Sequence, residues 1–354
     1  NYYYNGDVNF ASVINKNVFH KPKEITVGVN AEGGYNFKKN YWLGAKLMIA
    51  NVHYKDNYQD TSFFAFLNNQ NHFTIQAIPY GKIKFKIWQL KAGPNLIVTN
   101  RKFYVLPEIE NQLQIYKDYF VMYNEWKTQV KINSLHNLSL DNPFIVTDNY
   151  DNAIDEIRTI AGFRGSVKGF GYDVRFSQLV SRNQAQYVNE IFQTTTDTLP
   201  QATFNLQNVN IIKAWNPHFA LSYNKGSQFG AKAWFDYFIY NKNTAAQLSY
   251  LPKLKAGFSA FYNWNDKLYV SLDVTGHGKV NAVQYTYDDT LAQTTTLIPI
   301  KGLVDVNLSA NYFITKNIGV FVDLNNLGFQ KWQRFYRYPS YNFQVIAGVK
   351  LSFK

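Results

Sequence analysis

The end of this sequence alternates between apolar and polar side chains over twelve residues, 342–353, with Ile346 as the single exception. A period of two residues predicts a β-strand, because successive side chains of a strand point to opposite faces. One face of the predicted strand carries Phe343, Val345, Ala347, Val349, Leu351 and Phe353. With aromatic residues at both ends of this row, the strand is typical of a bilayer-spanning strand rather than of a small soluble core.

The same alternation recurs along much of the chain. It predicts strands over 156–167, 170–176, 229–239, 254–262, 268–274, 303–314 and 318–324. Phe343, Val345, Val349 and Phe353 form the terminal-strand signal, since bacterial outer-membrane barrels commonly close on a strand with an aromatic residue near the C-terminus. We therefore predict an all-β fold, a transmembrane antiparallel up-and-down β-barrel.

The composition agrees with such a barrel. The 354 residues are 46% hydrophobic and include 27 Tyr, 28 Phe and 7 Trp, yet the mean hydropathy is −0.31 and no apolar run approaches the roughly 20 residues of a spanning helix. Barrel strands need apolar residues only at alternate positions, and Tyr and Trp belong to the interfacial girdles. The alternative is a soluble β-sandwich or propeller, which the length of the alternating runs disfavours.

Strands in the less regular N-terminal third are predicted near 2–13, 24–36, 42–55, 72–80, 83–98, 102–115 and 119–130, with turns at 37–41, 79–82 and 117–118. The total is about 16 strands, with 14 as the alternative, in a single domain over 1–354. An even number puts both termini on the periplasmic side of a multi-pass protein of the bacterial outer membrane. The longer connections, expected on the extracellular side, are 56–71, 131–155, 186–202, 280–298 and 330–341.

Charged residues on the polar side of the alternating strands are expected to line the lumen. They are Arg158, Arg164, Asp173, Arg175, Lys232, Asp236, Lys255, Asp273, Asp305 and Asp323. Mixed charges there either line a polar channel or pair and block it, and the pattern leaves both open.

The net charge is +12, and its lysines and arginines are scattered rather than gathered in one patch, which argues against a nucleic-acid partner. Such charge on the lumen wall or around the mouth could favour anions or contact lipid phosphates, or could simply keep the rims solvated. The absence of cysteine excludes disulfides and thiolate chemistry. The chain starts at Asn1 without a signal peptide, and we interpret it as a mature or partly ordered product from which the targeting segment has gone.

We expect neither an enzyme nor a cofactor or metal. The six histidines show no metal-ligand spacing, and His277, between two glycines, is the one candidate for hydrolase chemistry. An Asp-rich stretch, 141–155, lacks the regular spacing of a calcium loop. The aromatic loop 330–341 is read as an interfacial girdle or a partner-docking surface; its candidate interface residues are Trp332, Arg334, Tyr336, Arg337 and Tyr338.

The stretches 302–312, 325–327, 338–339 and 343–349 resemble the barrel C-terminus of TonB-dependent receptor-like proteins of the Bacteroidota, and 140–144 resembles a segment of small barrels of that group. A barrel of about 22 strands would need roughly 500 residues, and no plug is recognisable. The resemblance therefore implies the barrel architecture and the outer-membrane address, without energised uptake.

Two functions follow from these features. The first is a passive pore for small hydrophilic solutes. The second is a non-transporting barrel subunit of an outer-membrane assembly, secretion or surface-lipoprotein complex. The expected partners are outer-membrane lipids, with other outer-membrane proteins or lipoproteins in the second case.

Overall fold

Long antiparallel strands dominate the computed structural model, which describes residues 2–14, 22–55, 69–145, 151–192, 201–241, 248–288 and 292–352. The strands of the N-terminal half are β1 (Tyr2–Ile14), β2 (Lys23–Lys38), β3 (Tyr41–Lys55), β4 (Asn69–Phe85), β5 (Trp88–Thr99), β6 (Lys102–Tyr116), β7 (Phe120–Lys131), β8 (Ala153–Val167) and β9 (Phe170–Phe192). Those of the C-terminal half are β10 (Gln201–Lys225), β11 (Phe229–Tyr237), β12 (Ile239–Tyr240), β13 (Leu254–Trp264), β14 (Leu268–His277), β15 (Val280–Tyr287), β16 (Gln293–Ile300), β17 (Leu303–Phe313), β18 (Ile318–Asn325), β19 (Gln333–Phe335), β20 (Tyr338–Pro339) and β21 (Gln344–Leu351).

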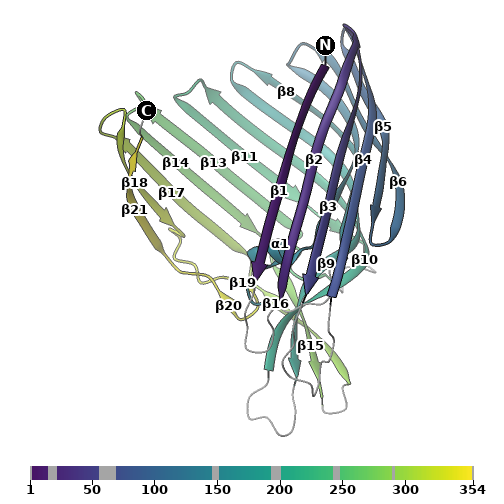
Figure 1. Ribbon diagram of the computed structural model, residues 1–354. Coiled ribbons are helices and arrows are strands. Elements are labelled where there is room, and N and C mark those ends of the chain that lie inside the picture. Colours follow the sequence, from purple (N-terminus) through teal and green to yellow (C-terminus); the bar gives the residue numbers. More distant parts are fainter. Residues whose placement is uncertain are drawn as a thin grey trace.

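The strands form one curved wall in which chain neighbours pair (Figure 1). The wall runs from β1 to β11 in chain order, with β12 continuing β11, and then through β13, β14, β17, β18 and β21. Within the described residues no pairing joins β1 to β21, so these two strands border the seam. Both chain ends lie at the same end of the wall (Figure 1), as an even number of strands in up-and-down order requires.

The two ends of the wall differ in their connections. The end that carries the termini has short turns, such as Lys168–Gly169 between β8 and β9. The opposite end, the long-loop end, carries the helix α1 (Leu135–Asp141), the hairpin β15–β16 and the small β19–β20 pair. This helix is the only one in the described part of the chain, and no helix there is long and apolar enough to cross a membrane.

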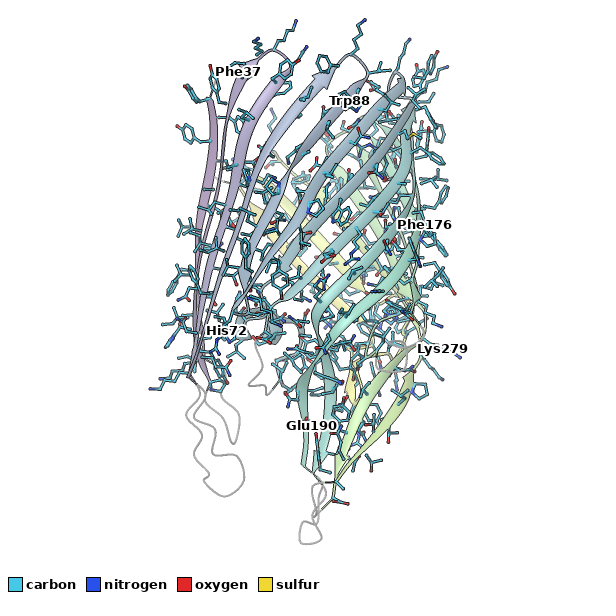
Figure 2. The ribbon with its side chains drawn as sticks, turned by 90° about the vertical axis from the view of Figure 1, so that its right-hand side faces the viewer. Phe37, His72, Trp88, Phe176, Glu190 and Lys279 are labelled. Carbon is cyan, nitrogen blue, oxygen red and sulfur yellow. The ribbon has the colours of Figure 1, made fainter. Side chains whose placement is uncertain are left out.

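Apolar side chains cover the outside of the wall. Cross-strand register joins Phe163 to Val174, Val174 to Phe219 and Phe219 to Phe235, so this row shares one face. The three phenylalanines are 41–45% exposed, and Figure 2 shows the neighbouring Phe176 directed away from the wall. A soluble sandwich would bury such a row between two sheets, whereas a transmembrane barrel turns it to lipid.

Most predicted strands are confirmed within a few residues, but one predicted turn is wrong. Residues 79–82 lie inside β4, and the turn comes later, at Lys86–Ile87. Pro79 and Gly81 suggest a reversal locally, yet Pro79 pairs in register with Ala45 of β3. Its missing N–H falls where the β4–β5 ladder is interrupted, between the Ala77–Leu96 and Gly81–Ala92 pairs.

Three segments expected to be loops are ordered structure in part. Residues 131–155 include α1, and 280–298 form most of β15–β16. The third, 186–202, overlaps the ends of β9 and β10, and β15 adds to β9 in parallel at 188–192. Each of these pieces gains its partners from distant parts of the chain, which local sequence does not report. Most of loop 56–71 lies outside the described residues.

Candidate functional site: the polar lumen and its long-loop mouth

Nine of the ten charged residues expected in the lumen share the face of the wall opposite to the apolar row. Register connects Arg175 to His218, His218 to Asp236, and Asp236 to Lys255, which places this row on one face. The remaining members follow the same face through their own partners: Arg164 with Asp173, Lys232 with Ser259, Asp273 with Asn307, Asp305 with Thr275, and Asp323 with Ser309. Arg158 lies at the bulge of β8.

Several lumen charges are held by neighbours rather than free. The hydroxyl of Tyr123 donates to Asp173 at 2.6 Å, Arg175 lies 4.0 Å from the same carboxylate, and the Arg164 guanidinium lies over the Tyr123 ring. Charge pairs of this kind fix side chains across the wall and leave a hydrated surface of mixed sign.

Between the adjacent strands β10 and β11, Asp236 contacts His218 at 2.9 Å and accepts a hydrogen bond from Asn216 at 3.1 Å. Asp323 likewise accepts from Ser309 at 2.5 Å, and Asp305 from Asn307 at 3.0 Å. The C-terminal part of the wall therefore presents partnered carboxylates to the lumen.

A second polar group lines β1–β7, where the sequence pattern singled out no residue. Tyr80 donates to Glu32 at 2.8 Å and also contacts the Tyr3 hydroxyl, and Lys46 lies 3.8 Å from Glu32. Lys91, Lys127, Glu110 and Glu125 form a further chain of ion pairs between 2.8 and 3.9 Å. In the sequence, only their positions on the polar side of an alternating strand could indicate that they face the lumen. In β7 the bulge at Trp126 interrupts that alternation.

At the long-loop end, α1 lies across the mouth. Its Leu135 and Leu138 pack in one buried cluster with Tyr54 of β3 and Leu206 of β10. In the order of the wall, β3 and β10 are separated by six strands, so the helix bridges opposite sides. Figure 1 shows α1 behind the lower ends of β1 and β2.

A buried carboxylate holds the start of this helix. Glu24 of β2 is 2% exposed and accepts from the backbone N–H groups of Leu135 at 2.5 Å and His136 at 3.1 Å. These N–H groups have no partner within the helix, and Ser134 caps a third one, that of Asn137. Since the neighbouring Ile25 is exposed on the outer face, Glu24 reaches α1 from the lumen side.

The segment 326–343, which joins β18 to β21, packs on α1 and on β9. Its Phe335 is 5% exposed and contacts the rings of Tyr187, Phe204 and Tyr250 at centroid distances of 4.9–5.9 Å. Arg334 pairs with Asp141 of α1 at 2.9 Å, and Tyr187 donates to the Leu138 carbonyl at 3.1 Å. We call α1 together with this segment the mouth crossing.

The five candidate interface residues of this loop have different surroundings. Arg334 and Arg337 are exposed, Trp332 and Tyr336 are half-buried, and Tyr338 meets Phe144 at 5.4 Å. Tyr336 donates its N–H to the Tyr250 hydroxyl at 3.1 Å, and burial raises the pKa of Tyr250 to about 12. The loop thus packs on elements of the long-loop end. The most buried ring of the segment, Phe335, was not among the predicted residues.

A buried carboxylate also lies on β8. Glu156 is 1% exposed and accepts from Arg158 and Arg182, each at 2.7 Å. It borders a cavity of about 470 Å³ that is also lined by Glu108, Lys127 and Tyr240. The two guanidiniums are about one-third exposed, so the group leaves one net positive charge near the mouth.

The remaining sequence candidates are not assembled into a site. His277 contacts the Gly278 carbonyl at 2.7 Å, and Asp141 and Asp155 bind Arg334 and Ser181. Among the described ranges no three His, Asp or Glu side chains are grouped to hold a metal. Val345 and Val349 of the terminal-strand signal face outward, Phe343 stacks on Phe329 at 4.9 Å, and Phe353 lies outside the described residues.

Comparison with solved structures identifies the class of fold. No protein-family model and no curated protein sequence matches the chain. The chain is similar in structure to outer-membrane receptor barrels of the TonB-dependent kind, and its fold is that of a transmembrane up-and-down β-barrel.

Three of these structures are the copper transporter OprC, the siderophore receptor PirA from Acinetobacter baumannii, and a variant of the ferric enterobactin receptor PfeA from Pseudomonas aeruginosa. The TM-scores are 0.63, 0.65 and 0.67, and the identities are 11%, 12% and 11%. In each case 99% of this chain is covered, against 62%, 59% and 59% of the other chain. This chain thus spans about three-fifths of the length of those proteins.

Proposed function

We propose that this chain forms an outer-membrane transport barrel that passes small hydrophilic solutes through its polar lumen and is gated at the extracellular mouth. By the usual rule for bacterial barrels, the long-loop end faces outward and the short turns face the periplasm. The likeness to a copper transporter and to siderophore receptors supports a role in solute passage. The expectations of a single domain, no catalysis and no plug remain part of this proposal.

The observation that carries the proposal is the mouth crossing. A buried acid, Glu24, and a buried ring, Phe335, hold α1 and the 326–343 segment across the lumen. Segments that lie across the mouth of the lumen control passage through it, which is a function that a non-transporting barrel does not have. A passive, permanently open pore is the simpler form of the proposal, and conductance distinguishes the two.

We expect wild-type protein in planar bilayers to show rare, small conductance steps. Glu24→Gln combined with Arg334→Gln removes the helix-capping charge and the Arg334–Asp141 pair, and should raise the open probability at least tenfold. Asp7→Asn is the matched control, because Asp7 accepts a hydrogen bond from Asn30 at 2.9 Å on β1 and β2, away from the residues of the crossing.

Equal, large conductance in all three proteins would contradict gating and leave the passive pore. Silence in all three would instead favour the second candidate, a barrel subunit of a multi-protein complex. One feature supports that candidate: β16 pairs only with β15 among the described strands, so its outer edge is available to a partner strand. Co-purification of an envelope protein at fixed stoichiometry would then be expected.

A further inference from the structure

At the end of the wall that carries the termini, each short turn contains a lysine or lies directly beside one. The turns and the strand ends beside them contain nine lysines and two aspartates, for a net charge of +7. The lysines are Lys38, Lys39, Lys84, Lys86, Lys117, Lys168, Lys225, Lys267 and Lys316, and all nine are exposed. We call them the lysine collar. The other end mixes both signs, as the Arg334–Asp141 pair illustrates.

The conformation of the turns does not favour lysine at three of these positions. Lys86, Lys117 and Lys168 have positive φ angles of 34°, 45° and 48°, a region that disfavours most side chains. Other short turns of the same wall place the favoured residues there, with Asn265 at 51° and Gly226 at 56°. Three turns therefore carry lysine where asparagine or glycine would be less strained.

The nine lysines of the collar outnumber the two aspartates of the same turns. Across the described ranges none of the nine lysines forms an ion pair. The two aspartates are occupied by amides, since Asp118 accepts from Gln114 at 2.9 Å and Asp266 from Asn263 at 2.7 Å. The collar therefore presents unpaired positive charge around the whole rim.

Aromatic rings lie beside the collar. Phe37, Phe85 and Phe170 are 61%, 42% and 64% exposed, and Trp88 stacks on Phe85. Figure 2 shows Phe37 and Trp88 at the short-turn end. Such rings mark the level of the membrane interface, and lysine stems at that level extend their ammonium groups toward the headgroups.

We propose that the lysine collar binds the headgroup phosphates of anionic phospholipids in the leaflet at the short-turn end. The proposal rests on the transmembrane placement under "Proposed function" and not on solute passage. A ring of positive charge at headgroup level fits a phosphate-bearing lipid surface, with each lysine contributing about fivefold to affinity at low salt.

The test uses purified protein in neutral detergent and native mass spectrometry with water-soluble, short-chain phosphatidylglycerol. The triple variant Lys86→Asn, Lys117→Asn and Lys168→Asn replaces the strained lysines by a residue suited to left-handed turns, so folding is preserved. The matched control is Lys253→Gln, Lys279→Gln and Lys301→Gln, three exposed lysines toward the long-loop end. Heat-dependent gel migration verifies folding of both.

We expect the triple variant to lose on the order of 100-fold in affinity at low salt, and the control to stay within about twofold. Phosphatidylcholine should bind without this dependence, and inorganic phosphate should compete only weakly. Equal losses in the two variants, or no preference of the wild type for phosphatidylglycerol, would overturn the proposal. So would tighter binding of polyglutamate, which would indicate an acidic protein partner, or full competition by inorganic phosphate. A silent barrel in the conductance assay leaves this result unaffected.

Discussion

Replacing Phe258 by arginine is expected to lower the free energy of unfolding in phospholipid vesicles by about 2–4 kcal/mol, the cost of a charge on the lipid face near mid-membrane. Phe258 is 40% exposed on the outside of β13 and pairs with Ala233 and Val274, which share its apolar face. Urea titration of the vesicle-embedded protein, followed by tryptophan fluorescence, measures the change.

The adjacent residue provides the control for that prediction. Ser259 lies on the lumen face, opposite Lys232 and Asp273, where an arginine keeps contact with water. Ser259→Arg should therefore cost less than about 1 kcal/mol. If Ser259→Arg lowered the free energy of unfolding more than Phe258→Arg, the face assigned to lipid would be wrong.

The second large effect is expected at the mouth crossing. Phe335→Ala removes a buried ring that contacts four other rings, and such truncations cost about 3–5 kcal/mol. Because this loss falls on the crossing and not on the wall, amide hydrogen exchange of α1 should accelerate by at least 100-fold. Amide hydrogen exchange of β8 and of residues 170–179 of β9 should stay near the wild-type rate.

Phe329→Ala is the control in the same segment. Phe329 is 64% exposed and, among the described residues, stacks on Phe343 alone, so its truncation should change exchange of α1 by less than about fivefold. If Phe335→Ala left α1 as protected as in the wild type, Phe335 would not be what holds the crossing in place.

The wall could be predicted from the sequence because its signal is local. In β17 apolar and polar residues alternate from Val304 to Tyr312, and in β18 they alternate with Phe321 as the one exception. The predicted strands 303–314 and 318–324 match Leu303–Phe313 and Ile318–Asn325. In a strand with lipid on one side and water on the other, parity alone decides orientation. The same reasoning places Arg175 of β9, Asp236 of β11 and Lys255 of β13 on one face.

The mouth crossing could not be predicted, for physical reasons. The helix α1 has seven residues, too few to establish a helical period. Glu24 resembles the other polar residues of an alternating strand until α1, more than 100 positions later, supplies its partners. The sequence does not distinguish Phe335 from the other aromatic residues of its loop, and only the fold reveals which of them is buried. These contacts are long-range and leave no trace in local sequence.

The central claim is that β13 and its neighbours separate lipid from water, and site-directed spin labelling tests it most directly. The chain has no cysteine, so single cysteines at positions 256–263 can be labelled one at a time in lipid vesicles. We predict that labels at 256, 258, 260 and 262 collide mainly with oxygen dissolved in the bilayer, and that labels at 257, 259, 261 and 263 collide mainly with a water-soluble nickel chelate. Equal exposure of all eight positions to the chelate would contradict the account.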